Sequence, residues 1–256
     1  ALAEAVRADL TELIDRLFPK EAVPDALDQE AQSHAAFGQR KRFAYVERPV
    51  HTEALDTAVV AGRAPLVVTG ESGSGKTALL AAWSSRWADR YPDDLLFEHY
   101  FGATPESASA ASFLRRLLGE LKRRYEIRDE IPTQPDKLRE ALPLWLAHTV
   151  GSGRLVLVLD GLNQIEGDEP DRRLVFLPLH FPPHVRVVAS SLSGEALDAL
   201  RERGWTEHAV PLTDEAERDR MIGAFLETYR KTLRPDLRAR VAAARGAANP
   251  LFLRTV

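Results

Sequence analysis

Residues 70–77 read Gly-Glu-Ser-Gly-Ser-Gly-Lys-Thr, and no other segment constrains the chain as strongly. They match G-x-x-x-x-G-K-[ST] in full, a loop whose glycines let backbone N–H groups turn inward around the phosphates of a nucleotide. The preceding APLVVT predicts a strand and the following ALLAAWSSRW predicts a helix, as this motif requires. The predicted nucleotide-binding residues are Gly70, Glu71, Ser72, Gly73, Ser74, Gly75, Lys76, Thr77 and Ala78.

Two side chains of this loop are expected to have specific roles. Lys76 reaches the β- and γ-phosphates in such loops, and the Thr77 hydroxyl ligates Mg²⁺. Only six of the 34 basic residues are lysine, so the sequence generally uses arginine where a positive charge is merely solvated. Position 76 departs from that habit, and the compact ammonium of lysine suits a phosphate site. A flexible Gly/Ser turn without a ligand is therefore the weaker interpretation.

The second half of the site is predicted at residues 155–160, Leu-Val-Leu-Val-Leu-Asp. A buried strand that ends in Asp160 brings a carboxylate towards the Mg²⁺ of a neighbouring phosphate loop. Asn163 and Gln164 then stand where a carboxylate would help to activate water. Either amide is a candidate to orient the attacking water, because glutamine does so in Ras-type GTPases. The alternative groups are the carboxylates of Glu166, Asp168 and Glu98.

Strands and helices alternate through the middle of the chain. Because long crossovers join the strands, we expect a parallel sheet with helices on both faces, which is a three-layer α/β sandwich. By analogy with P-loop proteins that insert a strand before the Asp160 strand, the predicted strand order is 5-1-4-3-2. Ser190 and Ser191 then end the fourth strand, where they are placed to sense the γ-phosphate. The strands are expected at Leu66–Thr69, Leu95–Phe101, Leu155–Leu159, Val185–Ala189 and His208–Leu212.

Helical segments are predicted on both sides of this core, and they give three parts. Residues 1–42 form an N-terminal helical segment, residues 43–212 the α/β core, and residues 213–256 the start of a helical lid. Thr213 is a plausible N-cap for the first lid helix. The chain opens without methionine and stops soon after a new helix begins, so we expect it to be a piece of a longer protein.

Composition and charge exclude several classes. The chain has no cysteine, which rules out disulfides and thiolate metal sites and favours a cytoplasmic location. No apolar run approaches the roughly 20 residues of a membrane span. The net charge of −4 makes a nucleic-acid partner unlikely. The basic clusters at residues 40–42 and 122–124 are interpreted as solvated helix faces.

Four stretches together resemble a STAND-class NTPase of the NACHT-like kind, as found in nephrocystin-like and telomerase-associated repeat proteins. They are GESGSGKTALL, LVLVLDGLNQ, RVVASS and the late NPLF at residues 249–252. The resemblance implies ATP or ADP with Mg²⁺ between the core and the lid, with Pro250 near the base. Arg48 matches the arginine of the family's N-terminal motif, where Glu47 replaces a glycine. Many relatives have arginine where this chain has Ser190 and Ser191.

The activity implied by the resemblance is slow ATP hydrolysis that drives a switch in a larger signalling or defence protein, with protein partners or self-association through domains outside residues 1–256. Three alternatives stay open. The amides at Asn163 and Gln164 favour a non-hydrolysing nucleotide-binding scaffold. A nucleic-acid-associated ATPase is disfavoured by the net charge of −4. A small-molecule kinase needs a cluster of lid arginines that the sequence does not identify. Adenine is preferred by resemblance, since no Asn/Thr-Lys-x-Asp guanine motif is present.

Overall fold

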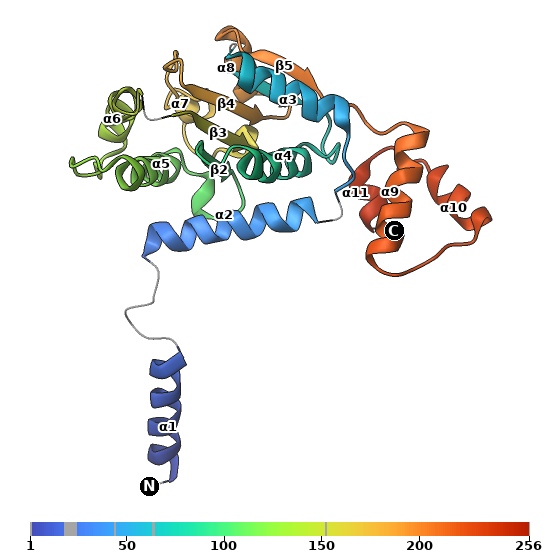
Figure 1. The fold of residues 1–256 in the computed structure, drawn as a ribbon, viewed down its shortest axis with the longest axis horizontal. Helices are drawn as coiled ribbons and strands as arrows, with labels where there is room; N and C mark the ends of the chain where they lie inside the picture. The colour runs from blue at the N-terminus through green and yellow to red at the C-terminus, as the bar shows by residue number, and fades with distance from the viewer. Residues whose placement is uncertain (1, 18–24, 44, 63–64, 152, 256) are drawn as a thin grey trace.

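Five parallel strands form one sheet at the centre of the computed structural model, which describes residues 2–17, 25–43, 45–62, 65–151 and 153–255. The strand order is β2-β3-β4-β1-β5 (Figure 1). Counted from the β5 edge, this is the predicted order 5-1-4-3-2. The strands are β1 (Leu66–Thr69), β2 (Leu95–Tyr100), β3 (Leu155–Asp160), β4 (Val185–Ser190) and β5 (Thr206–Ala209).

Helices cover both faces of the sheet, which confirms the predicted three-layer α/β class (Figure 1). One apolar layer joins α3 (Pro49–Ala61) and α4 (Lys76–Arg90) to the even-numbered positions of β3. The other layer packs the odd-numbered positions of β3 against the remaining core helices. Asp160 continues the even-numbered series, so its side chain lies on the α4 face, beside the phosphate loop. The helices of the second layer are α5 (Ala110–Tyr125), α6 (Pro135–His148) and α8 (Glu195–Glu202).

The strands β2, β3 and β4 each end within one residue of the prediction, whereas β5 is displaced. The fifth strand was expected at His208–Leu212, but β5 runs from Thr206 to Ala209. Because β5 is an edge strand, its side chains are largely exposed, and an apolar pattern does not reveal where it begins and ends. Its position is defined by its pairing register with β1. A short 3-10 turn, η2 (Glu106–Ala108), precedes α5, whose N-cap is Ser109.

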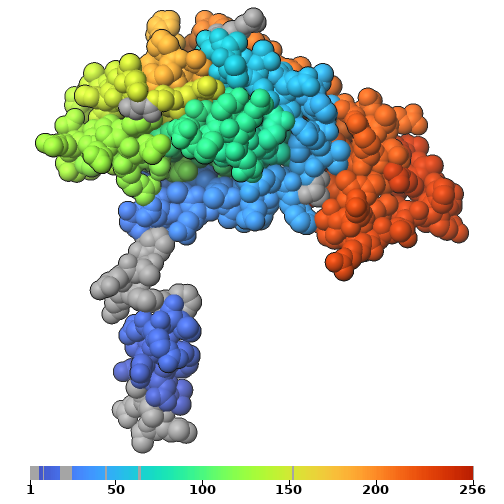
Figure 2. Space-filling view, in the orientation of Figure 1, coloured from blue at the N-terminus to red at the C-terminus, as the bar shows by residue number. Residues whose placement is uncertain are grey.

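The N-terminal segment contains α1 (Leu2–Leu17) and α2 (Ala26–Arg42); residues 1 and 18–24 of this predicted segment lie outside the described ranges. The large apolar side chains of the described part of α1 are exposed. α2 instead lies along the core and contacts both α4 and β2 (Figures 1 and 2). In the described part of the chain, no helix has the length and apolar character that crossing a bilayer requires.

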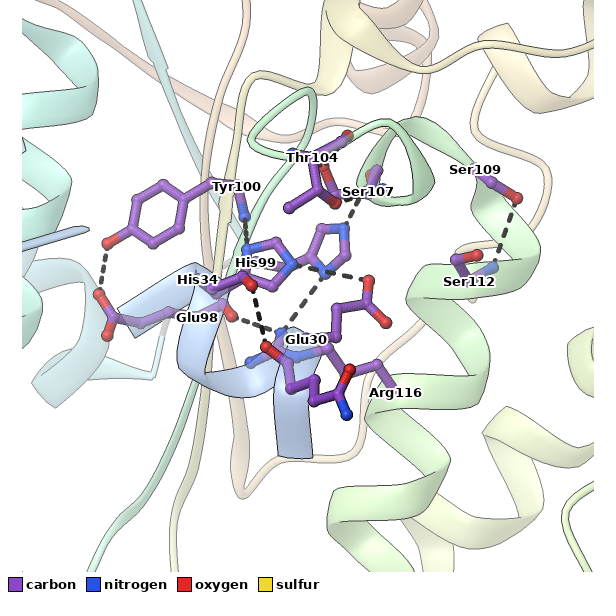
Figure 3. Close-up of polar contacts among 12 residues, drawn as sticks. Glu30, His34, Glu98, His99, Tyr100, Thr104, Ser107, Ser109, Ser112 and Arg116 are labelled. Carbon is purple, nitrogen blue, oxygen red and sulfur yellow. Dashed lines mark hydrogen bonds and ion pairs between the residues drawn. The ribbon is translucent and has the colours of Figure 1, made fainter. Parts of the chain in front are cut away.

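A buried polar cluster fixes α2 to the edge strand β2 (Figure 3). Nδ1 of His34 accepts a hydrogen bond from the backbone N–H of Tyr100 at 3.1 Å, which satisfies a donor on the open edge of the sheet. The ring centroids of His34 and His99 lie 4.3 Å apart, and Nε2 of His99 lies 3.0 Å from the carbonyl oxygen of Ser107. Arg116 donates to the carbonyl oxygen of Glu98 at 2.6 Å. The docking of α2 therefore depends on an uncharged His34.

We expect the free energy of unfolding to fall as pH drops below the ordinary histidine range. Burial lowers the pKa of His34 below 6.5, while Glu30 partly opposes the shift. Burial, with His34 next, holds the pKa of His99 well below 6.5. Because both folded pKa values are depressed, the stabilisation is complete above pH 6.5 and is lost as pH falls through the folded values. Urea titrations between pH 7.5 and 5 measure this loss.

A His34→Asn variant tests the origin of this pH dependence, because its amide oxygen replaces Nδ1 as the acceptor without titrating. We expect the pH-dependent loss of stability to shrink in this variant. The control is His180→Asn, which replaces an exposed histidine. Equal pH dependence in wild type and His34→Asn would show that α2 docking does not titrate through His34.

Three helices follow the sheet in the segment predicted to be the lid, namely α9 (Glu215–Thr228), α10 (Pro235–Ala242) and α11 (Pro250–Thr255). They share a small apolar cluster of their own, against which Val46 also packs. The predicted N-cap Thr213 is wrong: Asp214 caps α9 in a reciprocal capping box with Glu217. Thr213 instead donates from both its backbone N–H and its hydroxyl to the Ala248 carbonyl oxygen. That contact holds the first residues of the lid to its last turn.

Candidate functional site

The loop at residues 70–77 joins β1 to α4 and has the backbone that its glycines permit. Gly73 and Gly75 adopt φ angles of 81° and 99°, a left-handed region that favours glycine. A Cβ atom on Gly73 would lie 2.4 Å from Oδ1 of Asn249, and one on Gly70 would lie 2.3 Å from the carbonyl oxygen of Val210. Both the backbone angle and the close approach of the lid therefore require glycine at position 73.

Lys76 is the first residue of α4 and lies almost buried beside the loop. Its Nζ donates to the carbonyl oxygens of Gly70 and Glu71, each at 2.8 Å. Burial lowers the pKa of Lys76, and the carboxylate of Asp160 opposes this shift. The ammonium is thus held at the loop by the backbone itself, in the position from which a P-loop lysine contacts phosphate.

Asp160, at the end of β3, meets the loop from the neighbouring strand. Its Oδ1 accepts a hydrogen bond from the Ser190 hydroxyl at 2.5 Å, and the Thr77 side chain also hydrogen-bonds to it. Ser190 Oγ accepts from the backbone N–H of Gly161 at 2.9 Å. Burial raises the pKa of Asp160, while the hydrogen bonds from Ser190 and Thr77 and the charge of Lys76 lower it. The structure therefore joins the predicted sensor residue Ser190 to the predicted metal residue.

The Thr77 hydroxyl and the Asp160 carboxylate fit the needs of Mg²⁺. This ion prefers oxygen ligands, keeps several waters and is usually held by one or two protein oxygens together with phosphates. Within the described residues, this site included, no three His, Cys, Asp or Glu side chains gather around one point, so the ion would depend on few protein ligands. If the ion binds, Thr77 and Asp160 would hold it, and it would neutralise charge on the phosphates.

The two amides predicted to orient water have structural partners. Asn163 is exposed, and its Oδ1 accepts from the backbone N–H of Leu192 at 2.9 Å, which ties the loop after β3 to the loop after β4. Gln164 ends the short turn η3 (Leu162–Gln164) and lies against two glycines. A Cβ atom on Gly102 would lie 2.2 Å from its Oε1, and one on Gly161 would lie 2.9 Å from its Nε2. Their role towards water stays a prediction.

The three alternative carboxylates differ in their hydrogen-bond partners. Asp168 caps the short helix α7 (Glu169–Arg172) and accepts from the backbone N–H of Asp171 at 3.2 Å. Glu98 accepts from the Tyr100 hydroxyl at 2.6 Å. Glu166 has an exposed side chain, while its backbone N–H donates to the carbonyl oxygen of Ala108. Of the three, only Glu166 has no structural hydrogen bond to its carboxylate among the described contacts.

A cavity of about 240 Å³ lies between the phosphate loop and the lid. The core side is formed by the loop and by residues that precede α3, and the lid side by α9 and α11. Its lining includes the predicted residues Arg48 and Pro250. It also includes residues that the sequence did not single out for this site, namely Lys41, Phe43, Tyr45, Val46, His51, Leu79, Val210, Met221, Phe225, Leu251 and Arg254.

Arg48 links the core to the lid. Its Nε and Nη2 donate to the two carboxylate oxygens of Glu217 at 2.8 and 3.1 Å, and its Nη1 donates to the carbonyl oxygen of Pro211 at 3.1 Å. Such a two-pronged contact fixes geometry as well as charge. The guanidinium of Arg48 is buried, and the carboxylate of Glu217 balances its positive charge. A direct contact of Arg48 with nucleotide stays a prediction.

A histidine pair was also missed by the sequence analysis. Nδ1 of His51 lies 2.8 Å from Nε2 of His208, so one ring donates to the other. Burial, with the charge of Arg48 next, lowers the pKa of His51 to about 4. Burial also lowers the pKa of His208. Both rings are thus neutral at pH 7, and the pair joins the start of α3 to the edge strand β5.

The sequence analysis also missed the roles of Asn249 and Lys41. Nδ2 of Asn249 donates to the carbonyl oxygen of Ser72 at 2.8 Å, so the lid touches the phosphate loop directly. No local signal in the sequence reveals that contact. Lys41 belongs to a basic cluster interpreted as a solvated face, yet it is half-buried and lines the cavity. The rarity of lysine, which singled out Lys76, also applies to Lys41.

Three comparisons extend these observations. The NACHT domain family matches residues 64–217 of this chain. A TPR repeat-containing protein of Dictyostelium discoideum is 29% identical over 226 residues, which cover 73% of this chain and 14% of that protein. Nephrocystin-3 of Mus musculus is 30% identical over 141 residues, which cover 53% of this chain and 10% of that protein. The chain therefore spans about a seventh and about a tenth of the length of these relatives.

Two solved structures share the fold. A Walker-type ATPase of Pyrococcus abyssi superimposes with a TM-score of 0.52 at 13% identity and covers 82% of this chain and 66% of its own. Domain III of the replication initiation protein DnaA of Thermotoga maritima gives 0.52 at 21% identity and covers 84% of each chain. At these identities the likeness concerns the α/β fold alone.

Proposed function

This chain belongs to the NACHT domain family, and we propose that it is an ATP-binding, slowly hydrolysing switch module of a larger signalling or defence protein. Nucleotide binding follows from the family and from the complete phosphate loop. Slow hydrolysis, the switch and the need for Mg²⁺ are the parts that require experiment. Adenine is preferred over guanine mainly because of the family resemblance, and the sequence contains no Asn/Thr-Lys-x-Asp guanine motif.

One observation carries the switch proposal: the cavity is lined by the core and the lid together. The lid also holds the core by two polar links, Asn249 to the Ser72 carbonyl and Glu217 to Arg48. A ligand that fills this cavity contacts both the core and the lid. It can favour one position of the lid over another only if its contacts differ between the two positions. Asn249 supplies such a contact, because it is bonded to the loop that surrounds the phosphates.

Slow turnover is supported by the groups near Asp160. The amide of Asn163 is bonded to the backbone of Leu192, and the carboxylates of Asp168 and Glu98 have structural partners. These three side chains are therefore not free to activate water. Gln164 and Glu166 remain the candidates. An amide orients water without accepting its proton, which gives turnover at a low rate.

The main alternative is a scaffold that binds nucleotide without hydrolysing it. Both proposals require tight binding of ATP, so turnover distinguishes them. Isothermal titration calorimetry with Mg·ATP tests binding, and release of phosphate over hours tests hydrolysis. Binding with turnover supports the switch, binding without turnover supports the scaffold, and the absence of binding contradicts both. A nucleic-acid-associated ATPase would instead show hydrolysis stimulated by DNA or RNA.

Gln164→Glu is expected to raise the rate of ATP hydrolysis if water orientation limits turnover. The new carboxylate accepts the proton that the amide does not, an effect that general base catalysis places at roughly tenfold or more. Single-turnover hydrolysis measures the chemical step without product release. Glu166→Gln serves as the matched variant in the same loop. An unchanged rate in Gln164→Glu with a reduced rate in Glu166→Gln would assign water activation to Glu166.

Partners beyond the nucleotide, or self-association, are proposed to act through segments outside residues 1–256; the name of one relative mentions TPR repeats. A membrane partner is not part of the proposal. A cytoplasmic location stays a prediction from the cysteine-free sequence.

A further inference from the structure

We propose that Lys41, near the C-terminal end of α2, is a second cationic ligand for the phosphate chain of the bound nucleotide. The inference rests on the proposed function, since it concerns the same site. It adds that α2, and not only the core and the predicted lid, completes that site.

The position of Lys41 in the cavity is the first support. Lys41 lines the same cavity as Gly73, Lys76 and Thr77, and its side chain is half-buried. Its ammonium is one of the charges that lower the pKa of Asp160, so it lies within electrostatic reach of the end of β3. Two lysines from different helices, Lys41 of α2 and Lys76 of α4, therefore line the same cavity.

Lys41 also lacks an anionic partner within the described part of the chain. Its recorded contact is with the ring of Phe37, whose centroid lies 4.8 Å from Nζ. Arg48, a buried cation on the cavity wall, instead has its charge matched by Glu217. A half-buried ammonium without a carboxylate gains most from an anionic ligand, and a phosphate chain supplies several charges.

The packing of α2 explains why Lys41 points into the cavity. His34, Gly38 and Lys41 follow the i, i+4, i+7 spacing of one helix face. His34 bonds to the backbone of Tyr100, and a Cβ atom on Gly38 would lie 2.7 Å from the Tyr100 hydroxyl. Tyr100 stands opposite Asp160 in the register of β2 with β3. The face that docks α2 on the edge strand thus directs Lys41 towards the catalytic end of the sheet.

A plainer role for Lys41 is to stabilise the last turn of α2. Cations favour helix C-termini, and Arg40 and Arg42 share that effect. Both arginines are exposed, and neither lines the cavity. The plainer role therefore predicts the same result for Lys41 and Arg40, whereas a phosphate ligand predicts different results. Arg40 is the matched control because it has the same charge and lies on the same helical turn.

The consequence for the proposed switch is specific. Any partner that pulls α2 away from β2 also removes a phosphate ligand, so the N-terminal segment and the nucleotide are linked by a binding free energy. By the same linkage, bound ATP holds α2 against the core.

The test is Mg·ATP affinity by calorimetry for wild type, Lys41→Met, Arg40→Met and Lys76→Ala, with circular dichroism melts to establish folding. We expect Lys41→Met to bind roughly tenfold more weakly, the effect of one charge-assisted contact, and Arg40→Met to bind like wild type. Lys41→Arg should restore most of the affinity. Equal binding by wild type and Lys41→Met, or equal losses at positions 40 and 41, would overturn the inference. If wild type itself does not bind, the proposed function fails instead.

A second variant tests the route through α2. Gly38→Leu places a side chain against Tyr100 and should displace α2, so it should weaken Mg·ATP binding about as much as Lys41→Met. Because both changes remove the same contact, the double variant should lose no further affinity. Additive losses would show that Lys41 acts independently of α2 docking. If Gly38→Leu does not fold, the comparison of positions 40 and 41 still decides.

Discussion

Lys76→Ala is expected to weaken Mg·ATP binding by roughly a hundredfold, because it removes a charged hydrogen-bond donor of about 3 kcal/mol. The position of the Lys76 side chain supports an effect of this size. The ammonium is nearly buried and held by the carbonyl oxygens of Gly70 and Glu71, so it needs little reorganisation to meet a phosphate. The change also removes a charge that stabilises the Asp160 carboxylate.

Calorimetric titration with Mg·ATP measures this loss. The matched control is Lys137→Ala, which removes an exposed lysine paired with Glu140 on α6. It should bind ATP like wild type. Unchanged affinity in Lys76→Ala would end the assignment of residues 70–77 as a phosphate loop. A loss in both variants would indicate a general effect of net charge.

Asp160→Asn is expected to remove most of the gain in ATP affinity that Mg²⁺ provides, roughly tenfold or more by the same conversion. The amide keeps an oxygen that accepts from Ser190, so the local geometry is preserved. It lacks the negative charge that attracts a hydrated cation. Titrations with ATP in the presence of Mg²⁺ and in EDTA measure the ratio directly.

Stability separates this effect from misfolding. Asp160 is buried, and burial raises its pKa, which means that its charge is costly in the folded state. A neutral amide removes that cost, so the unfolding free energy of Asp160→Asn should not fall. Asp171→Asn, another carboxylate whose pKa burial raises, is the control. Full retention of the Mg²⁺ effect in Asp160→Asn would exclude it as a metal residue.

Much of the fold was accessible from local sequence. The strand, the loop and the helix of residues 65–91 form one contiguous signal, and the apolar run before Asp160 forms another. Long crossovers predict parallel strands, and the strand order, which was predicted by analogy with other P-loop proteins, is confirmed. The edge strand β5 was misplaced because its exposed side chains carry no apolar pattern.

The roles of single polar residues were much less accessible. Ser190 was placed correctly at the end of β4, but its bond to Asp160 joins positions in different strands. Asn163 was considered for catalysis, yet it bonds to the backbone of Leu192. Spacing along a chain identifies which residues reach the same edge of a sheet. It does not identify which of them bond to each other, because that depends on packing within an ångström or so.

The sequence by itself determined that this chain has a phosphate loop, an acidic strand end and a parallel sheet, because each is encoded in a short stretch with its own periodicity. Only the tertiary structure decided what surrounds them. The contacts of Asn249 with Ser72, Glu217 with Arg48 and His34 with Tyr100 join segments far apart in the chain. No local pattern specifies such pairs, since they form only when the lid and α2 dock on the finished core.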